Sequence, residues 1–330
     1  MSLRNRSPVR AYLTVTIITA VTIISFALYQ VSHIVAFASI ASRVTDRFGL
    51  ISECSADNHI QKTSVIPNTI HQIWKDANVS SYGTFNHRKD WQSMFEPLNY
   101  TVKLWTEADI RQLIQTKYTW LQHAYDSYPY DIQRADIARL LVVHSEGGMY
   151  ADLDVKPADA EKLQCLQNLD MEAVFVATCG NSGLSNHWFM AAPGANVLGD
   201  VLVEAARRSG SRRPLLPYMK VFWSTGPWMV TAALDKYFAR HPEARKTVGL
   251  LEEGYSRYAI HHAAGRSWHG ADGKMLNYVA DHFSMTRLVV FILAFTTTFC
   301  ILCRCGKRQM FSGVWRARSW MDNPRTWTRN

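Results

Sequence analysis

The chain has 330 residues, of which 48% are hydrophobic and 19% charged, and its formal net charge is +9. This length allows one sizeable domain together with membrane segments. Residues 1–10 carry three arginines and no acidic residue, and residues 304–330 carry seven basic residues and one acidic residue. The two tails account for the whole net charge, so the rest of the chain is formally neutral. A nucleic-acid-binding protein would need a basic domain with interleaved aromatic residues, and we predict no such role.

Residues 11–42 predict a membrane-spanning segment near the N-terminus. They contain no Asp, Glu, Lys or Arg, and the run is longer than the roughly 20 apolar residues that cross a bilayer. We find no convincing small-residue cleavage site, so we predict a signal anchor, with a cleaved signal peptide as the alternative.

A second apolar run, Leu288–Cys303, lies between Arg287 and Arg304. It is short for a spanning helix, but flanking arginines can reach the interface and the bilayer can thin. We predict a second transmembrane helix at 285–303, the alternative being a buried or interfacial helix. Basic tails favour the cytosol. The predicted order is therefore a cytosolic tail at 1–10, the anchor at 11–42, a stem at 43–64, a lumenal domain at 65–284, the second helix and a basic cytosolic tail at 304–330.

Two glycosylation sequons and three cysteines fall in the predicted lumenal part. The sequons begin at Asn78 and Asn99, which agrees with a lumenal domain. Cys165 and Cys179 could form a disulfide bond, but Cys54 leaves an odd number, and the sequence alone does not decide the pairing.

Strand and helix patterns alternate through the middle of the chain. Strands are predicted at 65–74, 100–105 and 173–178, and helices at 107–115, beginning after Thr106, and at 131–145, ending before two glycines. We read the second helix as amphipathic. Alternating strands and helices indicate an α/β layered domain with a mainly parallel sheet.

Residues 149–154 predict an apolar strand that ends in Asp152-Leu153-Asp154. Paired carboxylates suit Mg²⁺ or Mn²⁺, which bind a diphosphate, and ligands bind at the carboxyl ends of strands in such sheets. Upstream, Asp136 and Arg139 share a helix face and could line the same pocket, or form an exposed ion pair. The acid pair also fits a haloacid-dehalogenase phosphatase nucleophile. That motif belongs on the first strand of its domain, so a phosphatase is a minor alternative.

The residues around this acid pair resemble those of a known family. The pattern R-x-D-x-x-R…G-G-x-Y-x-D-x-D runs from Arg134 through Tyr150 to Asp154. It resembles glycosyltransferase family 32, which is distantly similar to the glucosylating clostridial toxins. The resemblance extends upstream to 66–74 and downstream to 224–227 and 261–268. In particular, the chain resembles fungal inositol-phosphorylceramide mannosyltransferases.

The resemblance implies a GT-A-like nucleotide-sugar-binding domain and a role for each motif residue. Asp154 would bind the metal directly, and Asp152 would contact the metal or the ribose. Asp136 and Arg139 would hydrogen-bond the donor sugar, and Trp74 would stack on the nucleobase.

The downstream motifs imply a loop that closes over the diphosphate, with His262, Ser267 and Trp268 as the site residues of this loop. We favour His262 over His261 as a metal ligand. Asn186 would lie near the donor sugar and Gly226-Pro227 on the acceptor side. Arg266 replaces a small polar residue and would contact phosphate or point to solvent.

These observations together predict a retaining glycosyltransferase dependent on Mn²⁺ or Mg²⁺. It would move mannose from GDP-mannose to inositol phosphorylceramide at the Golgi or ER membrane, with a regulatory membrane subunit as a possible partner. One alternative is a transferase acting on N-glycans or another glycolipid. A second is a catalytically silent subunit that binds nucleotide sugar or regulates a partner. A third alternative is a lipid-binding membrane scaffold, but the formally neutral lumenal domain offers no feature that favours it.

Overall fold

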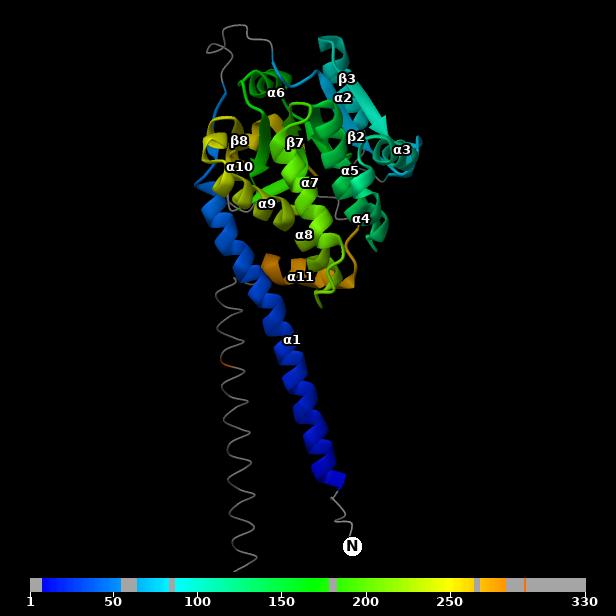
Figure 1. Ribbon diagram of the computed structural model, residues 1–330, viewed down its shortest axis with the longest axis vertical. Helices are drawn as coiled ribbons and strands as arrows, with labels where there is room; N and C mark the ends of the chain where they lie inside the picture. Colours follow the sequence, from blue (N-terminus) through cyan, green and yellow to red (C-terminus); the bar gives the residue numbers. More distant parts are fainter. Residues whose placement is uncertain are drawn as a thin grey trace, which may run out of the picture. The chain divides into compact units, whose positions relative to one another are not determined.

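The computed structural model describes residues 8–54, 64–82, 87–177, 183–263, 268–282 and 294 (Figure 1). The chain divides into two units, Met1–Gly270 and Ala271–Asn330. The second unit contributes helix α11 (Ala271–His282). The predicted second membrane helix at 285–303 and the tail at 304–330 fall outside the described residues, apart from residue 294 in the former.

Helices and strands alternate along the first unit. In order they are α1 (Pro8–Thr45), β1 (Gly49–Ile51), β2 (Thr69–Ile73), η2 (Val79–Ser81), α2 (Arg88–Phe95), η3 (Glu96–Leu98), β3 (Thr101–Trp105), α3 (Glu107–Lys117), η4 (Thr119–Leu121), α4 (Gln122–Ser127), α5 (Asp131–Glu146), β4 (Gly148–Ala151), β5 (Val155–Pro157), α6 (Ala160–Gln167), β6 (Ala173–Ala177), β7 (Leu184–Ala191), α7 (Asn196–Ser209), α8 (Pro217–Ser224), α9 (Pro227–Arg240), η5 (Pro242–Lys246), β8 (Val248–Leu251), α10 (Glu253–Ala259) and β9 (Ile260–His262). The predicted strands and helices coincide with β2, β3, β6, α3 and α5.

A seven-stranded sheet forms the centre, in the order β1-β8-β6-β7-β4-β2-β3. β7 runs antiparallel to β6 and β4, and the other neighbouring pairs are parallel. A short connection joins β6 to β7, and a connection this short allows only an antiparallel pair. The sheet is therefore mainly parallel, as predicted. A separate antiparallel pair joins β5 to β9.

Both faces of the sheet are buried under helices. Tyr150, Phe175 and Phe189 belong to one apolar cluster with α5, α7 and α9, whereas their chain neighbours Met149 and Val174 belong to a second cluster with α2 and α6. Successive strand residues point to opposite faces, so each strand supplies both layers. Apolar strands of this kind are typical of sheets covered on both sides.

The C-terminal part of α1 belongs to the folded domain. Ala41 and Val44 are fully buried, α1 packs on α9, and β1 pairs with β8. Residues 43–51 therefore differ from the predicted stem. Arg43 and Arg47 form ion pairs with Asp235 of α9.

Helix α5 is buried on nearly every side, so our interpretation of it as an amphipathic helix is wrong. Its residues from Asp136 to Val143 are all buried, and Asp136 and Arg139 are only 4% and 5% exposed. The alternative of an exposed ion pair at these two positions is likewise excluded. The helix ends where Gly147 adopts a positive φ of 68°, which glycine tolerates best.

The described disulfide bond joins Cys54 to Cys165, 111 residues apart in sequence. The pairing of Cys165 with Cys179 that we considered is therefore wrong. The bond ties the segment after β1 to α6.

Removing this bond should destabilise the domain. A disulfide that closes a long loop contributes about 3 kcal/mol, so we expect Cys54→Ser/Cys165→Ser to lower the Tm by roughly 6–12 °C. Thermal unfolding of the purified protein in detergent measures the change. Adding a reductant should lower the Tm of the parent to that of the variant; a parent Tm that ignores reductant contradicts the expectation.

Candidate active site

The Asp152-Leu153-Asp154 triplet follows directly after β4, at the carboxyl ends of β4 and β2. The backbone N–H of Asp152 donates to the His187 carbonyl of β7 at 2.9 Å, and Val155 N–H donates to the Asp152 carbonyl at 3.0 Å. The chain thus leaves the sheet in a tight turn that is fixed on both sides. This places the acid pair at the edge where α/β sheets bind ligands.

Helix α5 brings a buried ion pair to the same edge. Arg139 Nη2 lies 3.3 Å from Asp136 Oδ1. Asp136 also accepts hydrogen bonds from the Asn186 amide at 2.9 Å and from the Thr225 hydroxyl at 2.8 Å. Both carboxylate oxygens are therefore occupied, and the position of Asp136 is set by β7 and by the end of α8.

Arg139 connects this pair to the acid triplet. Its Nη1 donates to Asp152 Oδ2 at 3.2 Å and to the Asn186 carbonyl at 2.9 Å, and its guanidinium lies 5.3 Å from the centre of the Tyr150 ring. Tyr150 donates its hydroxyl proton to the other oxygen of Asp152 at 2.7 Å. The Nε atom of Arg139 is buried and has no hydrogen-bond partner among the described protein atoms. An arginine side chain has five N–H donors, and the contacts to Asp136, Asp152 and Asn186 use three of them.

The electrostatics of the site reflect its burial. Burial raises the pKa of Asp136 and of Asp152; Arg139 opposes both shifts, and the charge of Asp154 raises the pKa of Asp152 further. Burial alone would lower the pKa of Arg139, but the neighbouring Asp152, Tyr150, Asp136 and Asp154 together outweigh it, so the pKa is raised and the guanidinium stays charged. The site therefore holds closely spaced carboxylates in a poorly solvated place, where a bound cation would stabilise them.

His262 reaches the acid pair from the C-terminal part of the domain. β9 pairs with β5 so that His262 stands opposite Val155, and His262 Nε2 lies 3.6 Å from Asp154 Oδ2. His261 stands opposite Lys156 instead, and neighbouring strand residues point to opposite faces. The geometry thus brings His262 to Asp154.

Our sequence analysis missed His187 and Tyr82. The His187 ring stacks on that of His262 at 4.1 Å with an interplanar angle of 9°, and its Nδ1 hydrogen-bonds Ser185 Oγ. Burial lowers the pKa of His187 well below its usual value, and the neighbouring His262 adds to this. Burial raises the pKa of Tyr82, as do Asp154 and Asp152. Tyr82 lies in no motif, and His187 follows Asn186 in a segment where the resemblance points to Asn186 alone.

The remaining predicted residues take different places. Trp74 follows β2 and packs edge-on against Tyr82 at 4.8 Å, beside the acid pair. Asn186 is buried and holds Asp136 in place. Trp268 stacks on Tyr218 of α8 at 5.2 Å. Ser267 lies outside the described residues.

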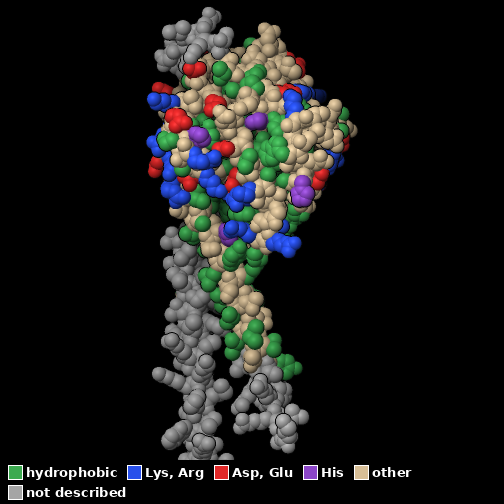
Figure 2. All heavy atoms as spheres, in the orientation of Figure 1, with side chains coloured by type: hydrophobic (Ala, Val, Ile, Leu, Met, Phe, Trp, Pro, Cys, Tyr) green, Lys and Arg blue, Asp and Glu red, His purple; other side chains and the backbone are tan. Residues whose placement is uncertain are grey.

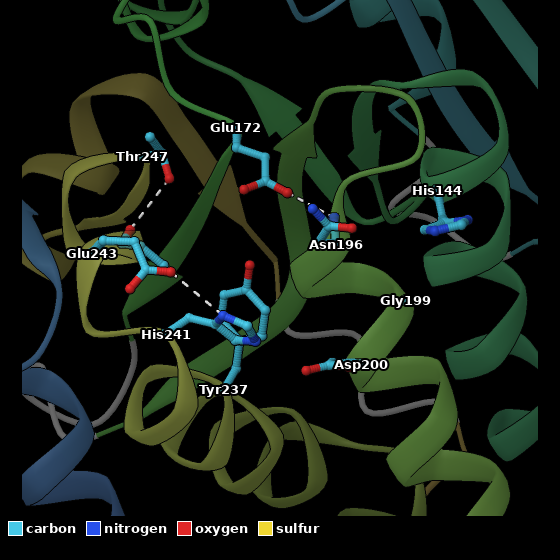
Figure 3. Close-up of a pocket in the computed structure, with 10 residues that line it drawn as sticks. His144, Glu172, Asn196, Gly199, Asp200, Tyr237, His241, Glu243 and Thr247 are labelled. Carbon is cyan, nitrogen blue, oxygen red and sulfur yellow. Dashed lines mark hydrogen bonds and ion pairs between the residues drawn. The ribbon is translucent and has the colours of Figure 1, made fainter.

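A cavity of about 580 Å³ lies at the other end of the parallel strands, where β6 and β8 begin (Figure 3). Glu172 and Thr247 in its wall come just before β6 and β8, whereas the acid pair comes just after the parallel strand β4. Its acidic groups are paired: Glu172 with the Asn196 N–H, and Asp200 with Arg240. This cavity is therefore separate from the acid triplet.

Among the described residues, no group of three His, Cys, Asp or Glu side chains converges closely enough to hold a metal by itself. The donor set of Asp152, Asp154 and His262 fits a hard divalent cation whose other ligands come from substrate phosphates. Such an incomplete set is the usual arrangement for Mg²⁺ in nucleotide-dependent enzymes.

Comparison with known proteins agrees with this arrangement. A family model described as "Glycosyltransferase sugar-binding region containing DXD motif" matches residues 63–173. Inositol phosphoceramide mannosyltransferase 1 of Schizosaccharomyces pombe is 28% identical over 267 residues, which cover 79% of this chain and 80% of that protein. Inositol phosphoceramide mannosyltransferase 3 of the same organism is 29% identical, over 73% of this chain and 66% of that protein.

Mannosyl phosphorylinositol ceramide synthase SUR1 of Saccharomyces cerevisiae is 27% identical, over 73% of this chain and 63% of that protein. The solved PaToxG Glycosyltransferase aligns with a TM-score of 0.37 and 15% identity, covering 68% of this chain and 87% of that chain. The family match covers α5, β4 and the acid triplet. The chain therefore carries a region that matches the DXD-containing sugar-binding region of the glycosyltransferases, and this match and the mannosyltransferases among its relatives support a glycosyltransferase enzyme.

Proposed function

We propose that this glycosyltransferase moves mannose from GDP-mannose to inositol phosphorylceramide and that it requires Mn²⁺ or Mg²⁺. The observation that carries the proposal is the chain of contacts that runs from the buried Asp136 through the buried Arg139 to the partly exposed Asp152. It lies at the edge where a nucleotide sugar would bind. The names of the relatives supply the choice of mannose and of the lipid acceptor.

The metal would be held by Asp154, Asp152 and His262. When bound, it supplies a Lewis acid that neutralises the leaving diphosphate as the glycosidic bond breaks. Burial of the carboxylates favours this role, because a cation relieves the cost of their charge.

Arg139 and Asp136 would bind the hydroxyl groups of the donor sugar. Asn186 and Thr225 hold Asp136 from two sides, and Tyr150 and Arg139 hold Asp152. The geometry of the polar groups is thus fixed before the donor binds, which lowers the cost of binding and orientation. The acceptor would attack the sugar on the same face from which the diphosphate leaves. Attack on this face would retain the anomeric configuration, as the family resemblance implies.

Helix α1 would anchor the enzyme in the Golgi or ER membrane with the domain in the lumen. Thr14–Thr45 is long and apolar enough to span a bilayer, and the arginines that precede it favour a cytosolic N-terminus. The sequon residues Asn78 and Asn99 are exposed, so a lumenal glycan could be attached at either. A second span at 285–303 and a regulatory membrane subunit complete the proposed organisation.

Trp74 would stack on the guanine base. Aromatic–base stacking contributes about 1–3 kcal/mol, so we expect Trp74→Ala to raise the donor KM by about tenfold or more while kcat changes little. Trp74→Phe should recover most of the loss. Trp120→Ala is the matched control, because Trp120 is 52% exposed. An equal donor KM in Trp74→Ala and Trp120→Ala would exclude the stacking role.

The proposed reaction is tested with the full chain purified in detergent. GDP-mannose, UDP-galactose, UDP-glucose and UDP-GlcNAc are each supplied with Mn²⁺ and inositol phosphorylceramide, and the lipid product is identified by mass spectrometry. Mannose transfer that stops with EDTA supports donor, metal and acceptor together. Transfer from a UDP-sugar would replace the donor, transfer only to N-glycans or another glycolipid would replace the acceptor, and a folded protein without turnover would favour a silent subunit.

A further inference from the structure

The loop before α8 lies where α1 leaves the folded domain. Gln30 of α1 donates to the Pro214 carbonyl at 2.8 Å and accepts from the Leu216 N–H at 3.2 Å. Gln30 is 6% exposed, whereas Tyr12 and Leu28 earlier in α1 are 76% and 46% exposed. The helix from residue 11, where the predicted anchor begins, to this point is about 29 Å long at 1.5 Å per residue. That length matches the roughly 30 Å hydrocarbon core of a bilayer, so the headgroup layer falls at the level of this loop.

The other end of α8 reaches the sugar site. Ser224 accepts a hydrogen bond from Gln133 of α5 at 2.6 Å, and Thr225 donates to Asp136 at 2.8 Å. An eight-residue helix is about 12 Å long. Helix α8 therefore spans the distance between the expected membrane surface and the residues that would hold the donor sugar, at the lower end of the domain in Figure 1.

The chemistry of this segment suits an anionic headgroup layer. Residues 210–226 contain three basic residues and no acidic one, and Arg212 and Arg213 are exposed. Tyr218 and Phe222 are half-buried and their rings lie 4.6 Å apart. Tyrosine side chains such as that of Tyr218 are enriched at the membrane interface, and exposed arginines are attracted to anionic lipids. Figure 2 shows Lys and Arg side chains on the lower part of the domain, where the apolar helix emerges.

We propose that residues 211–223, here called the α8 surface, rest on the headgroup layer of an anionic bilayer and present a lipid headgroup to the sugar site. The proposal rests on the proposed function, since it assigns the path of a membrane-resident acceptor with a phosphate headgroup. We choose a bilayer as the binding partner for two reasons. The α8 surface contacts α1, the proposed membrane anchor, and the α8 surface carries basic residues and no acidic residue.

Contact with the bilayer is tested without any enzymatic assay. The full chain is placed in nanodiscs of phosphatidylcholine alone, or of phosphatidylcholine mixed with phosphatidylinositol, and amide hydrogen exchange is measured. We expect slower exchange in residues 211–216 in the anionic discs, and loss of this protection in Arg212→Gln/Arg213→Gln. Equal exchange of this segment in the two kinds of disc overturns the proposal.

Presentation of the headgroup is tested by kinetics in the anionic discs. A basic residue near an anionic surface contributes about fivefold to binding, so we expect Arg212→Gln/Arg213→Gln to raise the apparent KM for the bilayer acceptor about 25-fold. The donor KM and the rate of donor hydrolysis should not change. Arg245→Gln/Lys246→Gln is the matched control, because these adjacent residues are also exposed and basic but lie on η5.

The two proposals fail in different ways. An unchanged acceptor KM in Arg212→Gln/Arg213→Gln, with normal transfer by the parent, overturns the α8 surface and leaves the proposed function intact. A parent protein that transfers sugar to no lipid overturns the proposed function, and the exchange experiment still decides whether the α8 surface contacts the bilayer.

Discussion

Replacing Asp154 by Asn lowers sugar transfer by about three orders of magnitude or more, because a metal acting as a Lewis acid contributes several kcal/mol to the transition state. The variant should fold normally. Asn keeps the shape of the side chain and removes one charge from a buried, like-charged pair, so its Tm should equal or exceed that of the parent. Transfer by the purified variant, with its Tm measured in the same detergent, checks both expectations.

Mn²⁺ binding gives a second readout for this variant that does not depend on turnover. Electron paramagnetic resonance in the presence of GDP should show bound Mn²⁺ in the parent and at least tenfold weaker binding in Asp154→Asn. Asp200→Asn is the matched control, because it removes a carboxylate from the separate acidic cavity. Full transfer activity in Asp154→Asn, or a comparable loss in Asp200→Asn, would contradict the metal role.

Replacing Arg139 affects both stability and donor binding. Arg139→Met leaves the buried carboxylate of Asp136 and the partly buried carboxylate of Asp152 beside an apolar side chain, and breaking a buried pair such as Asp136–Arg139 costs about 3–5 kcal/mol. Arg139→Lys keeps the charge but not the fork that contacts both carboxylates. We expect a smaller loss of stability, about 1–2 kcal/mol, and transfer still reduced about a hundredfold. Urea unfolding and steady-state kinetics measure the two effects.

Arg208 provides the matched control for Arg139. Its side chain is 7% exposed, compared with 6% for Arg139, and it pairs with Glu204. Arg208→Met should therefore destabilise the domain to a similar extent, while the folded fraction keeps the parental donor KM. If Arg139→Lys and Arg208→Lys have the same donor KM, Arg139 is a structural residue and does not contact the donor.

The sequence by itself determined the features that depend on local order. An uncharged run predicts the apolar helix, β4 ends at Ala151 directly before Asp152, and Thr106 precedes α3 as its N-cap. The spacing from Asp136 to Arg139 places both on one face of α5 because three residues are nearly one helical turn. Each of these features arises from neighbours within a few residues, and a sequence shows such neighbours directly.

Only the tertiary structure shows the features that depend on contacts between residues far apart in the sequence. Only the fold buries α5, so that Asp136 and Arg139 are internal rather than solvated. It also pairs Cys54 with Cys165 across 111 residues and stacks His187 on His262. Contacts of this kind join segments that share no local pattern, and their choice follows from how the sheet is ordered and which faces its helices cover. For this reason the sequence identifies the acid pair and its family, whereas the partners that hold the pair in place emerge only from the folded chain.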